Sequence, residues 1–311
     1  MSNPQAPRWN ATRLPDLTGR TAVVTGANSG LGLATVEALA RAGARVVLAV
    51  RDPRRGEAAA RTVTGAHGTL EVRPLDLADL ASIRRFAAEW QGDLDLLINN
   101  AGVMNLPESA TKDGFEMQFG TNHLGHFALT NLLLPYITDR VVTVCSAAHK
   151  TPASTHIHFD NLNLTGEYSP IAAYGQSKLA NLLFTLELQR RLTQAQSPVR
   201  AQASHPGWSS TNLQNNNATW ALRAFGKTIN RLFAQDADAG ALPTLFAATQ
   251  DLPGASYAGP DGRGEWRGSP TLVGRSARAS DPEAARRLWN VSEELTGVTF
   301  PKRLLVTATD A

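Results

Sequence analysis

A β-branched run that passes directly into three glycines and then into a helical pattern is the feature that most constrains the fold. Residues 21–25 read as a buried strand and residues 31–42 as a helix. Between them, Gly26 can take a positive φ, Gly30 lets the backbone approach a ligand, and Gly32 lets the helix pack closely on the strand. The free amides of the first helical turn favour an anionic group such as a pyrophosphate. Taken alone, such a loop also fits an ordinary strand-to-helix turn. The residues predicted to contact the ligand are Gly26, Asn28, Ser29, Gly30, Leu31 and Gly32.

Composition narrows the class of protein. The 311 residues are 42% hydrophobic and 18% charged, which suits one large α/β domain. The net charge is +3, and the basic residues are dispersed, so nucleic-acid binding is not implied. The single cysteine, Cys145, fits a reducing compartment. The sequence has neither an apolar run of about 18 residues nor the pattern of a signal peptide. A cytoplasmic protein without a membrane span is therefore expected.

Strands and helices alternate along the rest of the chain. Short apolar runs at residues 45–50, 70–77, 94–98, 140–146 and 199–203 read as further strands. Helical patterns separate them, among them residues 54–66 and a long helix at 113–137. This predicts an α/β fold: a single Rossmann-type, doubly wound, mainly parallel sheet with helices on both faces. Right-handed crossovers and a reversal of winding after the third strand place a crevice beside the glycine loop.

The residue after the second strand decides between cofactors. An acidic residue there binds the ribose hydroxyls of NAD, whereas an arginine can pair with the 2′-phosphate of NADP. Arg51 occupies this position, with Arg54 and Arg55 close behind, although Asp52 weakens the signal and the cluster also fits a solvated basic loop. These residue types favour NADP over NAD.

Two further strand ends fall at the same edge of the predicted sheet. Asp76, followed by Leu77, can accept a hydrogen bond from an adenine amino group or can instead cap a turn. The Asn99-Asn100-Ala101-Gly102 turn ends the fourth strand, and its small residues let a planar ring approach the backbone. Asp76, Leu77, Asn100, Ala101 and Gly102 are therefore predicted to contact the cofactor.

Three residues suggest proton-transfer chemistry. Tyr174 and Lys178 are four apart on a helical pattern and so share one face. An ammonium beside a phenol favours the phenolate and lowers the pKa of the tyrosine. Ser146 ends the fifth strand, where the crevice opens, so a hydroxyl, a phenol and an amine are expected to converge.

The order of these motifs resembles the short-chain dehydrogenase/reductase family. The matching pieces run from residue 21 to residue 211: Thr25-Gly26-x3-Gly30-x-Gly32, Asp76-Leu77, Asn99 to Gly102, Asn122, Ser146, Tyr174-x3-Lys178, and Pro206-Gly207 followed by Thr211. The retinol-dehydrogenase-like branch and its bacterial relatives are the most similar, on Arg51, residues 122–127, residues 157–159 and residues 177–181. This likeness does not imply that the substrate is a retinoid.

The resemblance implies a reaction and further site residues. It implies that a hydride passes between the nicotinamide of NADPH and a carbonyl or alcohol on a lipophilic substrate. Tyr174 is implied as general acid or base, Ser146 as hydrogen-bond donor to the substrate oxygen, and Lys178 as ligand of the nicotinamide ribose. Asn122 is implied to hold a water that relays protons toward Lys178, and Pro206, Gly207 and Thr211 complete the cofactor site. Homo-oligomers are common in this family.

Two other functions fit parts of the pattern. A regulatory protein could bind NADP(H) without catalysis, but it has no need of Asn122, Ser146, Tyr174 and Lys178 together. Nucleotide-sugar epimerases and dehydratases also use a tyrosine and lysine pair, but the Asn-Asn-Ala-Gly turn argues against them.

The remaining segments are predicted to shape the domain around the site. Residues 1–18 form an arm, and residues 19–311 form the single domain. Within it, residues 146–174 form a flap over the substrate, residues 208–235 a lid or a docked surface helix, and residues 251–311 a C-terminal extension. The extension includes an irregular stretch at 257–266 and a helix at 281–295. His149, His156 and His158 lack a cysteine or carboxylate at ligand spacing, so no metal site is predicted.

Overall fold

The computed structural model describes residues 8–150, 156–207, 236–302 and 304. Its centre is an eight-stranded sheet in the order β3-β2-β1-β4-β5-β6-β7-β8. The strands are β1 Thr21–Thr25, β2 Arg45–Val50, β3 Leu70–Pro74, β4 Leu94–Asn99, β5 Ile137–Val144, β6 Arg200–Ser204, β7 Tyr257–Pro260 and β8 Pro270–Leu272. Neighbours pair in parallel except β7 and β8, which are antiparallel. The predicted single Rossmann-type domain with a mainly parallel sheet is confirmed.

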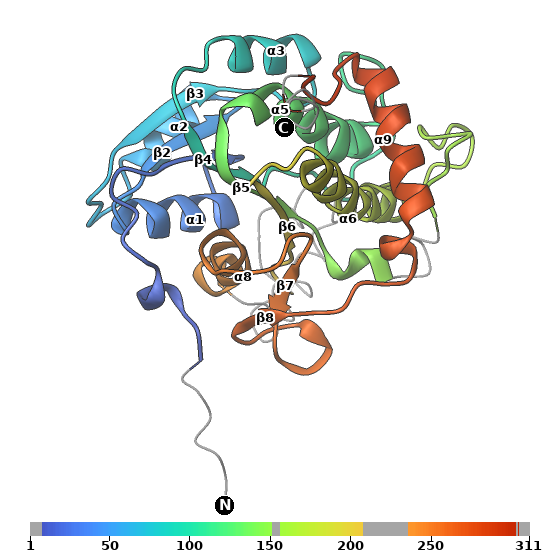
Figure 1. The fold of residues 1–311 in the computed structure, drawn as a ribbon. Helices are drawn as coiled ribbons and strands as arrows, with labels where there is room; N and C mark the ends of the chain where they lie inside the picture. The colour runs from blue at the N-terminus through green and yellow to red at the C-terminus, as the bar shows by residue number, and fades with distance from the viewer. Residues whose placement is uncertain (1–7, 151–155, 208–235, 303, 305–311) are drawn as a thin grey trace, which may run out of the picture.

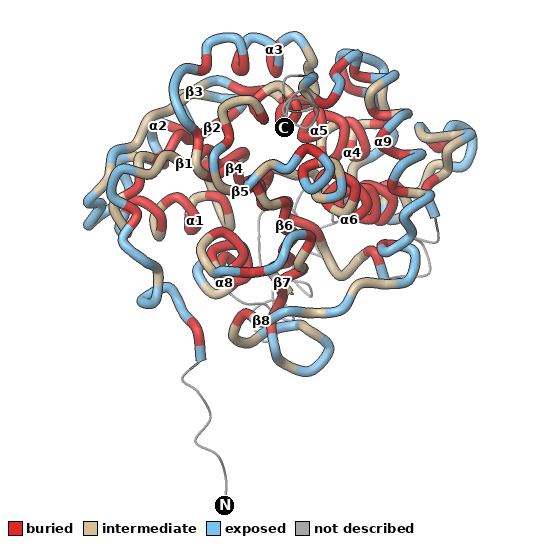
Figure 2. Tube along the Cα trace, viewed as in Figure 1, coloured by how far each residue is buried: buried red, intermediate tan, exposed pale blue. Residues whose placement is uncertain are grey.

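Helices cover both faces of this sheet (Figure 1). One face carries α1 Gly30–Arg41, α2 Pro53–Ala60 and α8 Ala237–Thr249, and the other carries α3 Leu80–Ala88, α5 Gly125–Leu133 and α6 Pro170–Gln194. A further helix, α9 Pro282–Thr296, packs along α6. Because both faces are covered, β1, β2 and β4 are each buried at all but one position rather than at alternate residues, and β2 is buried from Val46 to Val50 (Figure 2).

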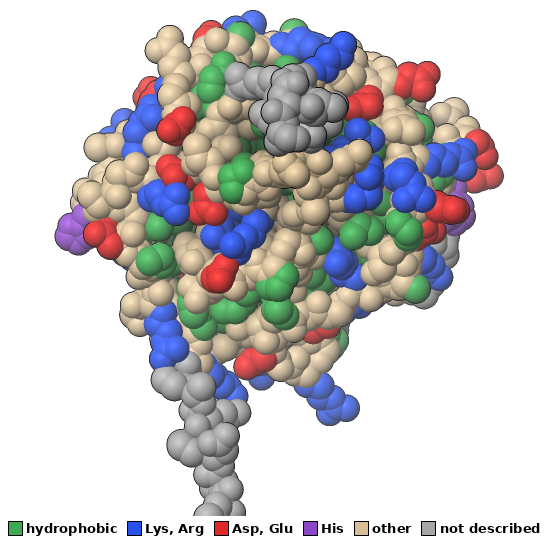
Figure 3. Space-filling model, in the orientation of Figure 1, with side chains coloured by type: hydrophobic (Ala, Val, Ile, Leu, Met, Phe, Trp, Pro, Cys, Tyr) green, Lys and Arg blue, Asp and Glu red, His purple; other side chains and the backbone are tan. Residues whose placement is uncertain are grey.

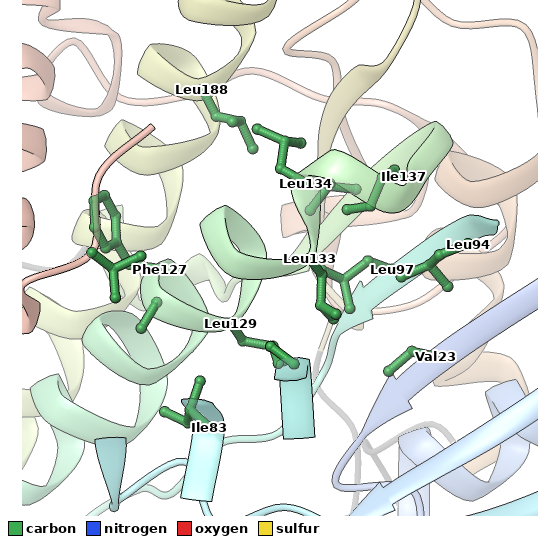
Figure 4. Close-up of a cluster of buried hydrophobic side chains, with 14 of the residues drawn as sticks. Val23, Ile83, Leu94, Leu97, Phe127, Leu129, Leu133, Leu134, Ile137 and Leu188 are labelled. Carbon is green, nitrogen blue, oxygen red and sulfur yellow. The ribbon is translucent and has the colours of Figure 1, made fainter. Parts of the chain in front are cut away.

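The largest apolar cluster lies between the sheet and the layer of α3, α5 and α6. Figure 4 shows Val23, Leu94 and Leu97 of the strands facing Leu129 and Leu133 of α5. Farther out, the buried Trp289 of α9 meets Phe127 and Phe184 at ring-centre distances of 4.9 and 5.8 Å. This packing fixes α5 and α6 against the sheet.

The strand order places the predicted site residues at one edge of the sheet. Winding runs from β1 to β3 in one direction and resumes at β4 on the other side of β1, as predicted. The carboxyl ends of β1, β4, β5 and β6 therefore lie at one edge. The glycine loop, the Asn100 turn, Ser146 and the Pro206–Gly207 turn follow those four strand ends.

Several predicted helix and strand boundaries are wrong. The helix predicted at 113–137 begins after Glu116, whose carboxylate accepts the amides of Gln118 and Phe119 as an N-cap. It then runs through α4 Met117–Phe119, a π-helical turn η2 Gly120–Leu124, α5 and a 3₁₀ turn η3 Leu134–Tyr136. The helix predicted at 54–66 ends at Ala60, before β-branched residues and a glycine. The strands predicted at 21–25 and 45–50 match β1 and β2, and those predicted at 94–98 and 199–203 differ from β4 and β6 by one residue. The strands predicted at 70–77 and 140–146 extend by two or three residues past the ends of β3 and β5.

The prediction that residues 257–266 are irregular is also wrong in its first half. Residues 257–260 form β7, which pairs with β6 through Ala203 and Ser204 and with β8 on its other side. The glycine and proline content concealed this strand. Gly259 is required there because a Cβ at this position would overlap the ring of His205.

Of the predicted N-terminal arm and lid, only the arm is described in part. Of the predicted arm, Trp9 packs edge-on against Phe246 of α8 at 5.4 Å, and the amide of Leu17 bonds to the carbonyl of Ala42. Residues 208–235, predicted as a lid, lie outside the described residues, as does Thr211. In the described parts of the chain, no helix is long and apolar enough to cross a bilayer. On the face seen in Figure 3, basic and acidic side chains are interspersed.

We expect Trp289→Ala to lower the free energy of unfolding by about 3–5 kcal/mol, because it empties the centre of an aromatic cluster that cannot collapse around an alanine. The matched control is Leu295→Ala on the same helix, where the side chain is 36% exposed and the change should stay within about 1 kcal/mol. Urea unfolding followed by circular dichroism measures both. Equal losses in the two variants would contradict the assignment of Trp289 to the core.

Candidate active site

The glycine loop has the conformation that its sequence requires. Gly26 and Gly30 have φ values of +65° and +53°, in the left-handed region. A Cβ on Gly32 would overlap the carbonyl oxygen of Gly26 and the side-chain amide of Asn100, so the close helix-to-strand packing predicted for Gly32 is present. Ser29 is the N-cap residue of α1, and its side chain makes no cap hydrogen bond. The half-buried loop residues 28–31 thus lead into a helix N-terminus whose amides suit an anionic group.

Thr25 joins this loop to the Asn100 turn. Its hydroxyl accepts the backbone amides of Asn100 and Ala101, both at 2.9 Å. The side-chain amide of Asn100 donates in return to the backbone carbonyl of Thr25 at 2.7 Å. Two predicted cofactor segments from strands β1 and β4 are therefore held as one unit.

Arg51 follows β2 and is exposed, as are Arg54 and Arg55. Asp52 is the N-cap of α2, and its carboxylate accepts the amides of Arg54 and Arg55 at 3.0 and 3.4 Å. Asp52, whose negative charge weakened the prediction of NADP over NAD, thus serves as a helix cap. Among the salt bridges of the described residues, none involves Arg51. Its guanidinium can therefore pair with a phosphate without first breaking an ion pair.

Asp76 makes a local turn. Its carboxylate accepts the amide of Ala78 at 3.0 Å, and its own amide donates to the hydroxyl of Ser82. The neighbouring Leu77 is buried, and its backbone carbonyl lies so close to Gly125 of α5 that a Cβ there would overlap it. Of the two interpretations left open for Asp76, the turn is present, and the contact with adenine stays a prediction.

Ser146, Tyr174 and Lys178 meet at the end of β5. The hydroxyl of Ser146 lies close enough to the Tyr174 phenol to lower its pKa. The ammonium of Lys178 lies 5.7 Å from the centre of the Tyr174 ring and donates to the carbonyl of Val144 at 3.0 Å. A Cβ on Gly102 would lie 3.5 Å from the Lys178 Nζ and 3.3 Å from the Asn122 Oδ1. The structure therefore brings all four predicted catalytic residues together beside the Asn100 turn.

Asn122 lies in the π-helical turn η2 and is fully buried. Its side chain pairs with the backbone of Val103 in both directions, accepting at 2.8 Å and donating at 2.9 Å. It also donates to the hydroxyl of Ser177 at 2.9 Å. The side chain thus ties the turn after β4 to α6 one residue before Lys178, and the predicted water contact stays a prediction.

Comparison with known proteins agrees with this geometry. A family model described as short chain dehydrogenase matches residues 20–159. Human retinol dehydrogenase 13 is 42% identical over 297 residues, which cover 91% of this chain and 86% of the relative. The chain belongs to the short-chain dehydrogenase/reductase family. It is a retinol-dehydrogenase-like oxidoreductase that acts on an alcohol or carbonyl group and uses a nicotinamide cofactor.

Other relatives of this dehydrogenase/reductase extend the likeness. Mouse polyprenol dehydrogenase is 39% identical over 300 residues, covering 91% of this chain and 86% of the relative. A crystal structure of a protein from Mycobacterium paratuberculosis is 56% identical, with a TM-score of 0.82, and the match covers 94% of this chain and 99% of that one.

His126 is a residue of the site to which the sequence interpretation gave no role. It is buried, and its Nδ1 lies 2.9 Å from the Asn122 carbonyl while its Nε2 lies 2.9 Å from the Thr25 hydroxyl. Burial lowers its pKa to about 4, so the ring is neutral at pH 7. Because a carbonyl only accepts, the proton sits on Nδ1, and Nε2 accepts from Thr25. The signal in the sequence was the spacing of four between Asn122 and His126, which brings a side chain to a carbonyl one turn back.

The turn after β6 that is predicted to contact the cofactor has Gly207 at a φ of +69°. Of the three histidines considered for a metal, His149 donates from Nδ1 to the Ser146 carbonyl at 2.7 Å, and His156 and His158 lie with ring centres 4.2 Å apart. Among the residues that the structure describes, no three potential ligands come together around a metal position.

The predicted flap is described in part. Its residues 156–161 line a cavity of about 460 Å³ with residues of α6 and α9, and none of the four predicted catalytic residues lines this cavity.

Burial shifts the pKa values of both Tyr174 and Lys178. It raises the pKa of Tyr174 to about 12, because its effect is larger than the opposing effect of the nearby Ser146 hydroxyl. This is opposite to the direction predicted from the sequence, because the cost of burying a phenolate outweighs the effects that favour it. Burial also lowers the pKa of Lys178 from 10.5 to about 8. At pH 7 the site therefore holds a protonated phenol and a buried ammonium.

We expect Lys178→Met to stabilise the protein at pH 7. Lowering a pKa from 10.5 to about 8 corresponds to a penalty of about 3 kcal/mol for the buried ammonium. Loss of the bond to Val144 costs about 1 kcal/mol, so the net gain is about 2 kcal/mol. Below pH 8 the lysine is charged in both folded and unfolded states, so the penalty is complete. It disappears as pH rises from 8 to 10.5, and the gain should shrink over that range.

Chemical denaturation at a series of pH values measures this gain. The control is Lys112→Met, because Lys112 is exposed and its ammonium pairs with Asp79 at 2.6 Å, so its removal should give no stabilisation. A Lys178→Met protein less stable than the parent at pH 7 would contradict the prediction.

Proposed function

We propose that this enzyme uses NADP(H) to transfer a hydride between the nicotinamide and the carbonyl or alcohol carbon of a lipophilic substrate. The observation that carries the proposal is that Ser146, Tyr174 and the Lys178 ammonium come together at the sheet edge that holds the glycine loop. A scaffold or regulatory protein has no use for this arrangement. Bound NADPH would supply the hydride.

The chain's own residues account for the proton. In the reduction direction Tyr174, protonated at neutral pH, donates its proton to the carbonyl oxygen, which becomes the alcohol hydroxyl. Ser146 hydrogen-bonds the same oxygen as negative charge develops on it. The Lys178 ammonium favours the phenolate that remains and can bind the nicotinamide ribose. In the oxidation direction the phenolate takes the proton from the alcohol.

Residues on the other strand ends fit the rest of NADP. The amides of the first turn of α1 suit the pyrophosphate, and Gly102, which follows Asn100 and Ala101, lies next to the Lys178 ammonium. The exposed Arg51 suits a 2′-phosphate. Asp76, Leu77, Pro206, Gly207 and Thr211 complete the proposed cofactor site. A lipophilic substrate is supported by relatives named for retinol and for polyprenol, both apolar alcohols.

The experiment that tests this function is a panel of aldehydes and ketones, with all-trans-retinal among them, assayed by loss of NADPH absorbance at neutral pH. We expect turnover with at least one apolar aldehyde. Binding of NADPH without turnover of any carbonyl would favour the regulatory alternative. A cytoplasmic location and a homo-oligomer stay predictions.

We expect Tyr174→Phe to lower turnover by about 10²–10⁴-fold, because it removes the proton donor and leaves the ring in place. NADPH binding, followed by fluorescence, should be retained. Tyr136→Phe is the control, since Tyr136 lies at the opposite end of β5 from Ser146. If Tyr174→Phe turns over as fast as the parent, Tyr174 is not the acid.

We expect Arg51→Ala to weaken NADPH binding by about tenfold or more and NADH binding much less, because only NADPH carries the phosphate that Arg51 can pair with. Arg61→Ala, an exposed arginine at the other end of α2, should change neither affinity. Equal losses for the two cofactors would remove the argument for NADP.

A further inference from the structure

The hairpin formed by β7 and β8 reaches the two strand ends that flank the proposed nicotinamide position. Its Glu265 lies in the connecting loop and accepts two hydrogen bonds from the Lys150 ammonium, at 2.7 and 2.9 Å. The same carboxylate lies 3.0 Å from the Nε2 of His205. Lys150 follows Ser146 in the turn η4 Ala147–Lys150, and His205 follows β6 directly. One carboxylate therefore connects the catalytic strand end to the cofactor turn.

His205 in turn holds the backbone of the cofactor turn. It is fully buried, and its Nδ1 accepts the amide of Gly207 at 3.2 Å. Burial lowers the pKa of His205 well below 6.5, against the opposing effect of Glu265 and with smaller contributions from Lys150 and His149. The ring is therefore neutral at pH 7, and since Nδ1 accepts, its one proton is on Nε2, which lies 3.0 Å from a Glu265 carboxylate oxygen without the alignment of a hydrogen bond.

Close packing leaves these segments little room to move apart. A Cβ on Gly207 would overlap the backbone carbonyl of Trp266, and a Cβ on Gly259 would overlap the His205 ring. The His205 ring also packs on Tyr257 of β7 at 5.1 Å. Glu265 itself has a φ of +58°, a left-handed conformation that a glutamate rarely adopts. A residue kept in this conformation suggests that its side chain is needed where it is.

We propose that His205 is a positioning residue that shapes the Pro206–Gly207 turn for the nicotinamide half of the cofactor, and that Glu265 holds its ring in the required tautomer. This inference rests on the proposed function, because it assumes that the nicotinamide binds at this turn. The adenosine half, at the far end of the cofactor, should be indifferent to both residues.

Two substitutions at position 205 separate the ring's contacts. His205→Asn keeps an oxygen near the place of Nδ1 and can accept the Gly207 amide in an Asx turn, but it cannot reach Glu265. His205→Gln can reach toward Glu265 but withdraws the acceptor from Gly207. A third variant, Glu265→Ala, removes the carboxylate and leaves His205 and the turn in the sequence unchanged.

Affinity is measured for NADPH and for adenosine 2′,5′-bisphosphate, a probe that contains only the adenosine half. We expect His205→Gln to weaken NADPH by about tenfold and to leave the bisphosphate within about twofold of the parent. His205→Asn should bind NADPH within about threefold of the parent. Glu265→Ala should weaken NADPH when His205 is present and have no effect in the His205→Asn background.

Each outcome decides the inference. Loss of NADPH affinity in His205→Gln with rescue by His205→Asn supports it, and so does an effect of Glu265→Ala that depends on His205. Equal losses for NADPH and the bisphosphate would overturn it, because they indicate general damage, and so would equal losses in the two His205 variants. If His205→Gln does not fold, the pair of Glu265→Ala measurements decides. A parent protein that binds neither ligand refutes the proposed function instead.

Discussion

The hydrogen bonds that join β1 to β4 are the constraint on which the site depends. β4 pairs with β1 on the side opposite β2, so the chain reverses its winding there and the two crossover layers separate. At the end of this pair the Thr25 hydroxyl accepts two amides from the Asn100 turn and donates to His126. His126 continues to the carbonyl of Asn122. A line of neutral, buried hydrogen bonds therefore extends from the glycine loop to the π-helical turn.

The proposed catalytic residues include a buried charge, which lowers the stability of the protein. Tyr174 and Lys178 project from α6, a helix of 25 residues whose other side chains are mostly buried between the sheet and α9. Such a helix cannot shift to solvate a charge, so Lys178 keeps its ammonium beside the Val144 carbonyl and at a reduced pKa. The same rigidity fixes the distance between the amine and the phenol. The rigidity of α6 therefore both fixes the position of the two side chains and destabilises the buried Lys178 ammonium.

Much of this arrangement could be predicted from the order of residue types. The apolar strand runs, the three glycines and the Tyr174-x3-Lys178 spacing each report a local geometry, and their sequence along the chain determined the topology. What could not be predicted depended on contacts between distant segments. The direction of the Tyr174 pKa shift depends on how deeply the ring is buried, and β7 was missed because its pairing with β6 overrides a composition rich in glycine and proline. His205 and Glu265 lie 60 positions apart and share no local pattern.

The π-helical turn η2 determines which way the side chains of α5 face. A π turn holds one residue more than an α turn, so everything after Leu124 is rotated by about 100° relative to an unbroken α-helix. Nearly all of α5 is buried, and its residues therefore face their neighbours only in that rotated phase. Converting this π turn to an α turn without removing a residue would rotate α5 by about 100° and turn its contacts toward the wrong neighbours, whereas removing one residue would let a regular helix keep the present phase. A local irregularity thus sets the angular register of a whole core helix.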